Sequence, residues 1–423
     1  MIEIQIIRQS PELVKQKLSV KNFSDLHLVD EILQADEERR AIQKQLDDIR
    51  SRENAIAKEI GVLFKEGKKE EAETKKAETV SLKEESATLT SRFNETEKKQ
   101  FDLLVQLPNL PCDVVPKGKT AEDNEVVKQV GEIPVLHANA QPHWELGKKY
   151  DLFDLELGVK ITGAGFPVYK GKGAKLQRAL IAFFLDRAIE AGYNEIIPPH
   201  MVNEASAFGT GQLPDKEGQM YYAAADNLYL IPTAEVPVTN IVRDEIFDEK
   251  QLPIKMTAYS PCFRREAGSY GKDVRGLNRV HQFDKVEIVQ IQHPAKSYET
   301  LDSMCAHVES LLQALELPYR ILRLCGGDMS FSSALTYDFE VYSTAQQRWL
   351  EVSSVSNFET YQTNRMKVRF RDENKKTTLC HSLNGSAMAL PRIVAGILEN
   401  HQKEDGIYIP KALQPYTGFD KIV

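Results

Sequence analysis

The chain has few cysteines and no long hydrophobic run. Its 423 residues include only five cysteines, scattered and without a C-x-x-C pair. This spacing argues against a disulfide framework and against a tetrahedral zinc site, so we expect no structural zinc. No apolar stretch approaches membrane-spanning length, and the first residues lack the basic and apolar regions of a signal peptide. We therefore expect a soluble protein of the cytoplasm, with no membrane partner.

An excess of positive charge is also absent. The formal net charge is -8 at pH 7, so composition alone does not predict nucleic-acid binding. The segment "GKGAKLQ" at Gly171 does not fit the P-loop pattern, and no G-x-G-x-x-G follows a predicted strand. Any nucleotide would therefore have to be held by arginines instead of a glycine-rich loop.

Two long stretches near the N-terminus have the hydrophobic pattern of a coiled coil. The segment "KEGKKEE" between them supplies a turn at Gly67, and a short turn predicts an antiparallel hairpin. At 1.5 Å per residue, each helix of about 35 residues would be about 50 Å long and would project as an arm. Its charges are mixed in sign, so a scaffold or dimerisation coil and a macromolecule-binding arm both fit the pattern. The apolar positions with heptad-like spacing are Ile42, Leu46, Ile49, Ile56, Ile60 and Leu63, then Leu82, Leu89, Phe93, Leu103 and Leu107.

Composition changes after the arm. The stretch "QLPNLPCDVVPKGKTAEDNE" contains three prolines, which break the helix. We predict a helical N-terminal domain over residues 1–108, a linker over 109–135 and a second domain over 136–423. In the second domain, short β-branched or aromatic runs follow one another with only turns between them, interspersed with helical stretches. This pattern favours an antiparallel sheet flanked by helices, so the predicted fold class is α+β.

One short stretch concentrates charge. "FRREAGSYGKDVRGLNRVHQFDKVE" starts at Phe263 and reads as two strands joined by a loop. Alternation predicts that Arg264 and Glu266 share one face of the first strand, and that Arg279, Phe283 and Glu287 share one face of the return strand. The intervening loop has three glycines and several cations, which suits closure over an anionic ligand. A surface hairpin with cross-strand ion pairs is the alternative.

Two further segments carry polar side chains suited to ligand binding. "LEVSSVSNF" places Glu351 close to Ser354, a carboxylate and a hydroxyl that fit a hard cation such as Mg²⁺. "LIPTAEVP" places Thr233 and Glu235 between prolines. Each signal is weak by itself, because isolated polar residues of this kind are usually structural.

A third segment combines a turn with a helix. "SLNGSAMALPRIVAGILENHQ" predicts a turn at Asn384, Gly385 and Ser386, followed by an apolar helix with Arg392 near its start. A lone arginine at such a position is usually a surface charge. Whether Arg392 has a function therefore depends on the other segments that occur with it in the sequence.

In this order, these segments resemble the motifs of class II aminoacyl-tRNA synthetases, most closely the bacterial type of the seryl-tRNA synthetase family. "GYNEIIPPHMV" looks like motif 1, which implies a dimer interface. "CFRREAGSYGKDVRGLNRVHQFDKVE" looks like motif 2, and "NGSAMALPRIVAGILENHQ" looks like motif 3. "TAE", "EVSS" and the helical hairpin narrow the resemblance to the seryl branch. The resemblance covers essentially the whole chain.

The resemblance implies an ATP-dependent ligase. Such an enzyme activates L-serine to seryl-adenylate with release of pyrophosphate, and then transfers the seryl group to the 3′ end of serine tRNA. The implied partners are L-serine, ATP with Mg²⁺, serine tRNA and a second copy of the chain; the family also serylates selenocysteine tRNA. The resemblance further implies that residues 1–108 are a tRNA-binding domain, whose helical arm reaches across the dimer to the tRNA. Two alternatives are a catalytically silent relative that binds tRNA or another partner, and a relative that loads a carrier protein.

The resemblance also implies roles for single residues. Arg264 would bridge the serine carboxylate and the ATP α-phosphate, and Glu266 would meet the adenine amino group. Phe283 would stack on the base, with Arg392 on its other side, and Glu287 would take the substrate ammonium. Arg264, Glu351 and Arg392 would be the catalytic residues. The remaining implied contacts are Arg265, Arg279, Val352 and Ser353 with ATP, Glu351 and Ser354 with Mg²⁺, and Thr233, Ala234, Glu235, Asn384 and Ser386 with serine.

Overall fold

The computed structural model describes residues 1–215, 218–266 and 275–423, which form two compact units. The first comprises Met1–Ser19 and Phe23–Pro108, and the second comprises Val20–Asn22 and Asn109–Val423. Within the described part of the chain, no helix combines the length and the apolar character needed to cross a membrane.

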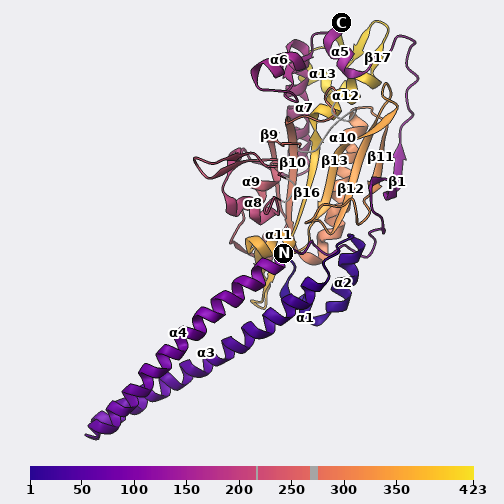
Figure 1. Ribbon diagram of the computed structural model, residues 1–423. Helices are drawn as coiled ribbons and strands as arrows, with labels where there is room; N and C mark the ends of the chain where they lie inside the picture. Colours follow the sequence, from indigo (N-terminus) through magenta and orange to yellow (C-terminus); the bar gives the residue numbers. More distant parts are fainter. Residues whose placement is uncertain (216–217, 267–274) are drawn as a thin grey trace. The chain divides into compact units, whose positions relative to one another are not determined.

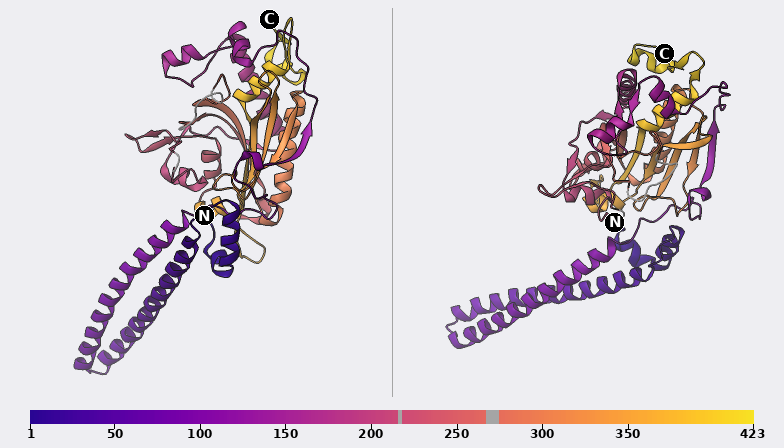
Figure 2. Two further views of the ribbon diagram at one scale, coloured as in Figure 1. Left: turned by 45° about the vertical axis from the view of Figure 1, so that its right-hand side comes forward. Right: turned by 45° about the horizontal axis from the view of Figure 1, so that its top comes forward.

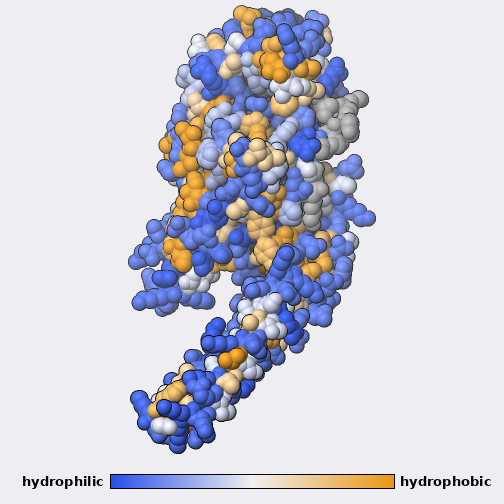
Figure 3. Space-filling model, turned by 60° about the vertical axis from the view of Figure 1, so that its left-hand side comes forward, coloured by the Kyte–Doolittle hydropathy of each residue, from blue (hydrophilic) through white to orange (hydrophobic). Residues whose placement is uncertain are grey.

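The first unit is dominated by two long antiparallel helices (Figures 1 and 2). The chain reverses at Gly67, whose φ of +76° is costly for other residues. The apolar seam predicted from the heptad spacing is confirmed: Ile42, Ile49 and Leu89 are among the residues that pack in it. On the face shown in Figure 3, the surface of the hairpin is mostly hydrophilic. The helices are α1 (Ile4–Gln9), α2 (Pro11–Val20), α3 (His27–Lys65) and α4 (Lys69–Leu104).

A buried carboxylate ties the base of this hairpin together. Asp36 of α3 is fully buried and accepts hydrogen bonds from Nε and Nη2 of Arg8, both at 2.6 Å. Nε2 of Gln100 in α4 donates to Asp36 at 2.9 Å. Burial alone would raise the pKa of Asp36, but the hydrogen bonds from Arg8 and Gln100 outweigh it and lower the pKa to about 2. Because a buried carboxylate needs all its partners, Asp36 fixes the register of α1, α3 and α4.

The second unit is built on an eight-stranded sheet in the order β1-β11-β12-β13-β16-β10-β9-β4. All neighbours are antiparallel except β4 and β9, and the α+β fold class is confirmed. Strand β1 falls within the stretch predicted to be a linker and pairs with β11 at the edge of the sheet. The strands are β1 (Glu125–Val130), β4 (Asn194–Glu195), β9 (Ile254–Phe263), β10 (Gln282–Gln292), β11 (Tyr319–Arg323), β12 (Leu335–Ser343), β13 (Arg348–Asn357) and β16 (His381–Ala389).

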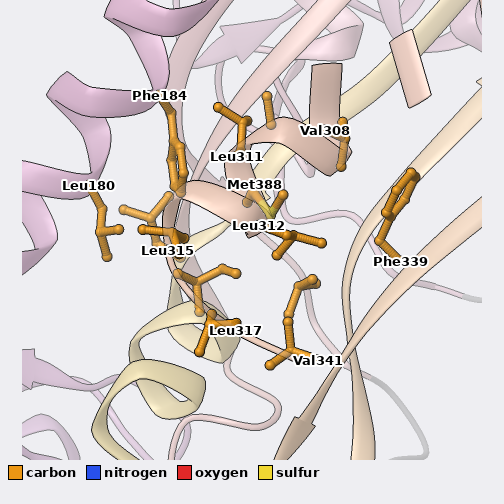
Figure 4. Packing of buried hydrophobic residues seen from close by; sticks show 14 of the residues in the cluster. Leu180, Phe184, Val308, Leu311, Leu312, Leu315, Leu317, Phe339, Val341 and Met388 are labelled. Carbon is orange, nitrogen blue, oxygen red and sulfur yellow. The ribbon is translucent and has the colours of Figure 1, made fainter. Parts of the chain in front are cut away.

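Three helices cover one face of the sheet and form the main core. Leu180 and Phe184 from the helix Gly171–Glu190, Leu311 from the helix Ser297–Ala314, and Phe339 and Val341 from β12 pack together in this core (Figure 4). Burial of such side chains contributes about 1.5 to 3 kcal/mol each relative to exposure. The three helices are α7 (Gly171–Glu190), α10 (Ser297–Ala314) and α12 (Leu390–Asn400).

The other face of the sheet is polar. In β10, Val286 and Ile288 belong to the main core, whereas the alternate residues Phe283, Lys285 and Glu287 line a cavity. Side chains of a strand alternate between its faces, so the same pattern that packs the helices turns the charged residues to the opposite side. The sheet therefore has one face for stability and one for a site.

The predicted turn at Asn384, Gly385 and Ser386 is wrong, because these residues lie inside β16. Gly385 pairs with Ile288 of β10 on one side and with Val355 of β13 on the other. A Cβ on Gly385 would lie 3.0 Å from the nearest carbon of Val355. Asn, Gly and Ser favour turns locally, but pairing with two neighbouring strands overrides that preference.

Smaller elements complete the second unit, among them a three-stranded sheet in the order β15-β14-β8, another in the order β17-β18-β19, a third in the order β5-β7-β6, and the pair β2-β3. They are α5 (His143–Lys149), β2 (Phe153–Asp154), α6 (Leu155–Ile161), β3 (Val168–Tyr169), β5 (Met201–Val202), α8 (Glu204–Thr210), β6 (Tyr222–Ala223), β7 (Leu228–Leu230), α9 (Glu235–Asn240), β8 (Ile246–Asp248), α11 (Tyr361–Met366), β14 (Arg369–Arg371), β15 (Thr377–Leu379), β17 (Gln402–Lys403), β18 (Gly406–Tyr408), α13 (Gln414–Thr417) and β19 (Lys421–Ile422).

Candidate active site

The polar face of the sheet carries a cavity of about 630 Å³. Two of the predicted site residues are not among those that line it: Ala234 is fully buried, and Arg265 is exposed to solvent. The cavity brings together side chains that are more than 150 residues apart in the sequence. The predicted residues that line it are Thr233, Glu235, Arg264, Glu266, Arg279, Phe283, Glu287, Glu351, Val352, Ser353, Ser354, Asn384, Ser386 and Arg392.

One end of the cavity combines an aromatic ring with arginines. The guanidinium carbon of Arg264 lies 5.2 Å from the ring centroid of Phe283, and Nε of Arg264 donates to the carbonyl of Pro232 at 3.3 Å. Glu266 accepts a hydrogen bond from Nη1 of Arg279 at 3.1 Å. The aromatic face and the cations make this end suitable for a base and its phosphates.

The predicted strand positions of three of these residues are wrong. Strand β9 ends at Phe263 and β10 begins at Gln282, so Arg264, Glu266 and Arg279 lie outside both strands. Glu266 has a φ of +48°, a left-handed conformation outside the β region that residues of a regular strand occupy. The loop predicted to close over an anionic ligand includes residues 267–274, which lie outside the described residues.

Arg392 is held at the start of α12 by main-chain oxygens. Its Nη1 donates to the carbonyl of Glu351 at 2.7 Å, and its Nε donates to the carbonyl of Asn278 at 2.9 Å. Nη1 also lies 3.5 Å from the carboxylate of Glu351. Since α12, β13 and the segment before β10 all contribute, the position of this guanidinium is set by tertiary structure and not by its own helix.

A group of oxygen ligands lies beside Arg392. Ser354 is paired in register with Asp338 of β12, and Oδ1 of Asp338 is buried with no hydrogen bond within the described ranges. Both residues line the cavity together with Glu351. Carboxylate and hydroxyl oxygens suit a hard cation such as Mg²⁺. Among the described residues, no group of three or more His, Cys, Asp or Glu could hold a metal ion alone, so a cation here would need ligand oxygens as well.

The opposite end of the cavity holds a buried carboxylate. Glu287 is 2% exposed, and its Oε2 accepts a hydrogen bond from Oγ1 of Thr233 at 3.0 Å. Lys285, which the sequence interpretation missed, forms a buried ion pair with the same carboxylate. A signal for it existed, because residues two apart in a strand share one face.

A second carboxylate shares this end. Glu235 accepts a hydrogen bond from Nε2 of Gln362 at 2.6 Å. Burial, and then the negative charge of Glu287, raise the pKa of Glu235 to about 7, although the hydrogen bond from Gln362 opposes the shift. Glu235 is therefore only partly ionised at neutral pH, and a ligand that carries a single ammonium group would stabilise its charged form.

We predict that Glu235→Gln stabilises the protein at alkaline pH. An acid whose pKa is raised on folding from 4.5 to about 7 binds its proton more tightly in the folded state. Stability is therefore lost as pH rises through this range. The neutral amide avoids this loss, so the variant should be more stable than the wild type by up to about 3 kcal/mol at pH 8 and nearly equal to it at pH 4. Urea unfolding at both pH values tests this; a variant that is no more stable at pH 8 would contradict it.

Comparisons with known proteins cover the whole chain. Residues 1–111 match the family model described as the seryl-tRNA synthetase N-terminal domain. Residues 221–401 match the tRNA synthetase class II core domain of the G, H, P, S and T group. The chain is 52% identical over 424 residues to the serine-tRNA ligase of Salinibacter ruber, covering 100% of this chain and 99% of that one.

Two solved structures are similar over the same extent. The seryl-tRNA synthetase from Pyrococcus horikoshii complexed with ATP has a TM-score of 0.94 at 36% identity, covering 100% of this chain and 99% of that one. The cytoplasmic serine-tRNA ligase from Naegleria fowleri in complex with AMP has a TM-score of 0.88 at 28% identity, covering 100% of this chain and 98% of that one.

Proposed function

The chain belongs to the seryl-tRNA synthetase family and is a serine-tRNA ligase, and we propose that the described cavity is where it joins serine to ATP. The observation that carries the assignment of roles is the position of Arg264. Its guanidinium lies against Phe283 at the aromatic end, and it lines the same cavity as the buried Glu287. A single cation between a base-binding ring and an ammonium-binding carboxylate can contact both reactants.

Serine would bind with its ammonium at Glu287. One oxygen of that carboxylate is already engaged by Thr233 and Lys285, which leaves the other for the substrate. Asn384 and Ser386 line the same cavity and supply polar groups for the serine hydroxyl. The serine carboxylate would then point toward Arg264.

ATP would bind with its base against Phe283. Glu266 would accept a hydrogen bond from the adenine amino group, and Arg392 and Arg279 would neutralise the phosphates. Arg392 is well placed for this because two main-chain carbonyls hold it. The assignment of Arg265, Ala234, Val352 and Ser353 to the site remains a prediction from the resemblance.

The reaction needs alignment more than acid-base catalysis. The serine carboxylate is already an anion, so its attack on the α-phosphorus requires no general base. Two anions must be held together while charge builds up on the phosphate. Arg264, placed between them, lowers their mutual repulsion, and the adenylate is then kept from water until the seryl group is transferred.

Mg²⁺ fits beside the phosphates. Glu351 and Ser354 would hold it, with Asp338 nearby supplying a buried oxygen that has no hydrogen bond within the described ranges. When bound, Mg²⁺ would withdraw charge from the phosphate oxygens. Glu351 also orients Arg392 through its main-chain carbonyl. Strand β13 would therefore both bind the ion and position the arginine that neutralises the phosphates.

We further propose a homodimer in the cytoplasm. Strand β4 ends the eight-stranded sheet, and the two residues after it include Ile197, whose side chain is 88% exposed. Ile241 and Ile246 are also exposed apolar residues of this unit. Exposed apolar residues, of which Ile197 directly follows the edge strand, support an interface between two copies, as the resemblance to motif 1 implies.

Amino-acid-dependent exchange of pyrophosphate into ATP, without tRNA, tests the proposed chemistry. We expect exchange with serine, and at least a roughly hundredfold lower kcat/KM with threonine or alanine. Alanine would leave polar groups of the pocket unpaired, and threonine must fit an additional methyl group. No exchange with any of the three, in a folded protein that still binds tRNA, would favour the catalytically silent relative.

A further inference from the structure

Outside the cavity, the second unit contains a buried polar network centred on Glu399 of α12. Glu399 and His143 of α5 are both fully buried. One oxygen of Glu399 accepts hydrogen bonds from the main-chain N of His143 at 3.0 Å and from its Nδ1 at 2.7 Å. Nε2 of Gln346 donates to the same oxygen at 3.1 Å, and the hydroxyl of Ser343 donates to the other.

The donors around Glu399 determine its charge state and the orientation of each partner. Burial alone would raise the pKa of Glu399, but the pKa is lowered, and the hydrogen bond from the His143 ring is the largest of the effects that lower it. A carboxylate only accepts, so Gln346 must point its amide nitrogen at Glu399 and its Oε1 away from it. His143 must likewise carry its proton on Nδ1, which leaves Nε2 as an acceptor.

Both free acceptors are used by the segment that leads into β10. The main-chain N of Leu277 donates to Nε2 of His143 at 2.8 Å. Nδ2 of Asn278 donates to Oε1 of Gln346 at 2.9 Å. A Cβ at Gly276 would lie 2.2 Å from Nε2 of His143, so the backbone approaches the ring as closely as glycine allows.

This segment in turn holds Arg392. The carbonyl of Asn278 accepts from Nε of Arg392 at 2.9 Å, and Leu277, Asn278 and Arg392 all line the cavity. A continuous chain of hydrogen bonds therefore runs from the buried carboxylate of Glu399, through Gln346 and Asn278, to the guanidinium at the phosphate end of the site.

We propose that Glu399, His143 and Gln346 are positioning residues for ATP: they hold the Leu277–Asn278 backbone where it can orient Arg392. None of the three lines the cavity, so they act through other groups and do not touch the substrate. The inference rests on the proposed function of Arg392 at the phosphates. It adds to the ATP site His143 and Gln346, which lie outside the quoted motifs, and gives a role to Glu399 within the motif 3 segment.

Gln346→Met tests the proposal by removing the link while keeping the side-chain length. We expect the KM for ATP in serine-dependent exchange to rise about fivefold to tenfold, because the variant loses both hydrogen bonds of the Gln346 amide in this network, to Glu399 and from Asn278, with kcat changed less than about threefold. The affinity for ATP measured by calorimetry without serine should fall by the same factor. Gln290→Met is the matched control, because Gln290 is a buried glutamine that bonds Tyr193 and lies outside the cavity lining.

Gln346→Glu provides a second test. It keeps an acceptor for Asn278 but sets two carboxylates against each other, so it should raise the KM for ATP further than Gln346→Met does.

The outcomes separate this inference from the proposed function. A wild-type protein that neither binds ATP nor exchanges with serine would overturn both. A wild type that does both, with Gln346→Met and Gln290→Met showing equal KM values and equal losses of thermal stability, would overturn the positioning role alone. A KM for ATP in folded Gln346→Glu equal to that of the wild type would also overturn it, because the contact between residues 346 and 399 would then not affect the ATP site.

Discussion

Arg264→Ala will abolish serine-dependent pyrophosphate exchange. Arg264 is the cation that lies against the ring of Phe283, with its Nε bonded to the main chain at Pro232. Without Arg264, the serine carboxylate and the α-phosphate of ATP would repel each other more strongly, because no guanidinium would neutralise part of their negative charge. Removal of one preorganised donor from a developing negative charge typically costs roughly 100-fold to 1000-fold in rate, and in the proposed site one guanidinium would contact both reactants. We expect a loss of at least about 1000-fold in kcat/KM, measured by exchange at saturating ATP.

Arg264→Lys is the matched variant. It keeps the positive charge but loses the planar donors and the stacking surface, so we expect a residual activity between that of the wild type and that of Arg264→Ala. Circular dichroism would show that both variants are folded. Near-normal exchange in Arg264→Ala would remove Arg264 from the reaction and with it the assignment of roles in the cavity.

Shortening the helical arm should separate the two half-reactions. The base of the arm must be preserved, since Asp36 with Arg8 and Gln100 fixes the register of its helices. Removing residues 45–65 and 70–91, and keeping 66–69 as the turn, retains these contacts together with Ile42 and Phe93 of the seam.

Such a protein should activate serine normally but fail to charge tRNA. Every residue that lines the cavity belongs to the second unit, so exchange should stay within about twofold of the wild type. If the arm binds tRNA, kcat/KM for charging should fall at least about 100-fold, which corresponds to a loss of about 2.7 kcal/mol in binding free energy. Aminoacylation with radiolabelled serine measures this directly.

Unchanged charging would mean that the arm does not bind tRNA. Its mixed surface charge, with Lys75 paired to Glu59 and Lys76 to Glu73, is also what a scaffold or dimerisation coil would show. Analytical ultracentrifugation of the shortened protein would then distinguish these two roles, because only loss of a dimerisation coil would convert a dimer into a monomer.

The local sequence pattern was sufficient to predict an element where that element depends on residues that are close together in the sequence. The heptad spacing from Ile42 to Leu89 predicted the seam of the hairpin, because residues three and four apart share a helix face in any context. Alternation predicted the two faces of β10 in the same way. The motif residues then indicated the family, and most of them line one cavity.

The sequence by itself determined the hairpin, the α+β class and the residue types of the site, while tertiary structure decided how those residues act. The sequence at Asn384, Gly385 and Ser386 is typical of a turn, yet pairing with β10 on one side and β13 on the other makes these residues part of a central strand. The raised pKa of Glu235 depends on burial next to Glu287, 52 positions away along the chain. The bonds from His143 and Gln346 to Glu399 carry no local signal, because burial, charge pairing and hydrogen-bond direction depend on partners that only folding brings together.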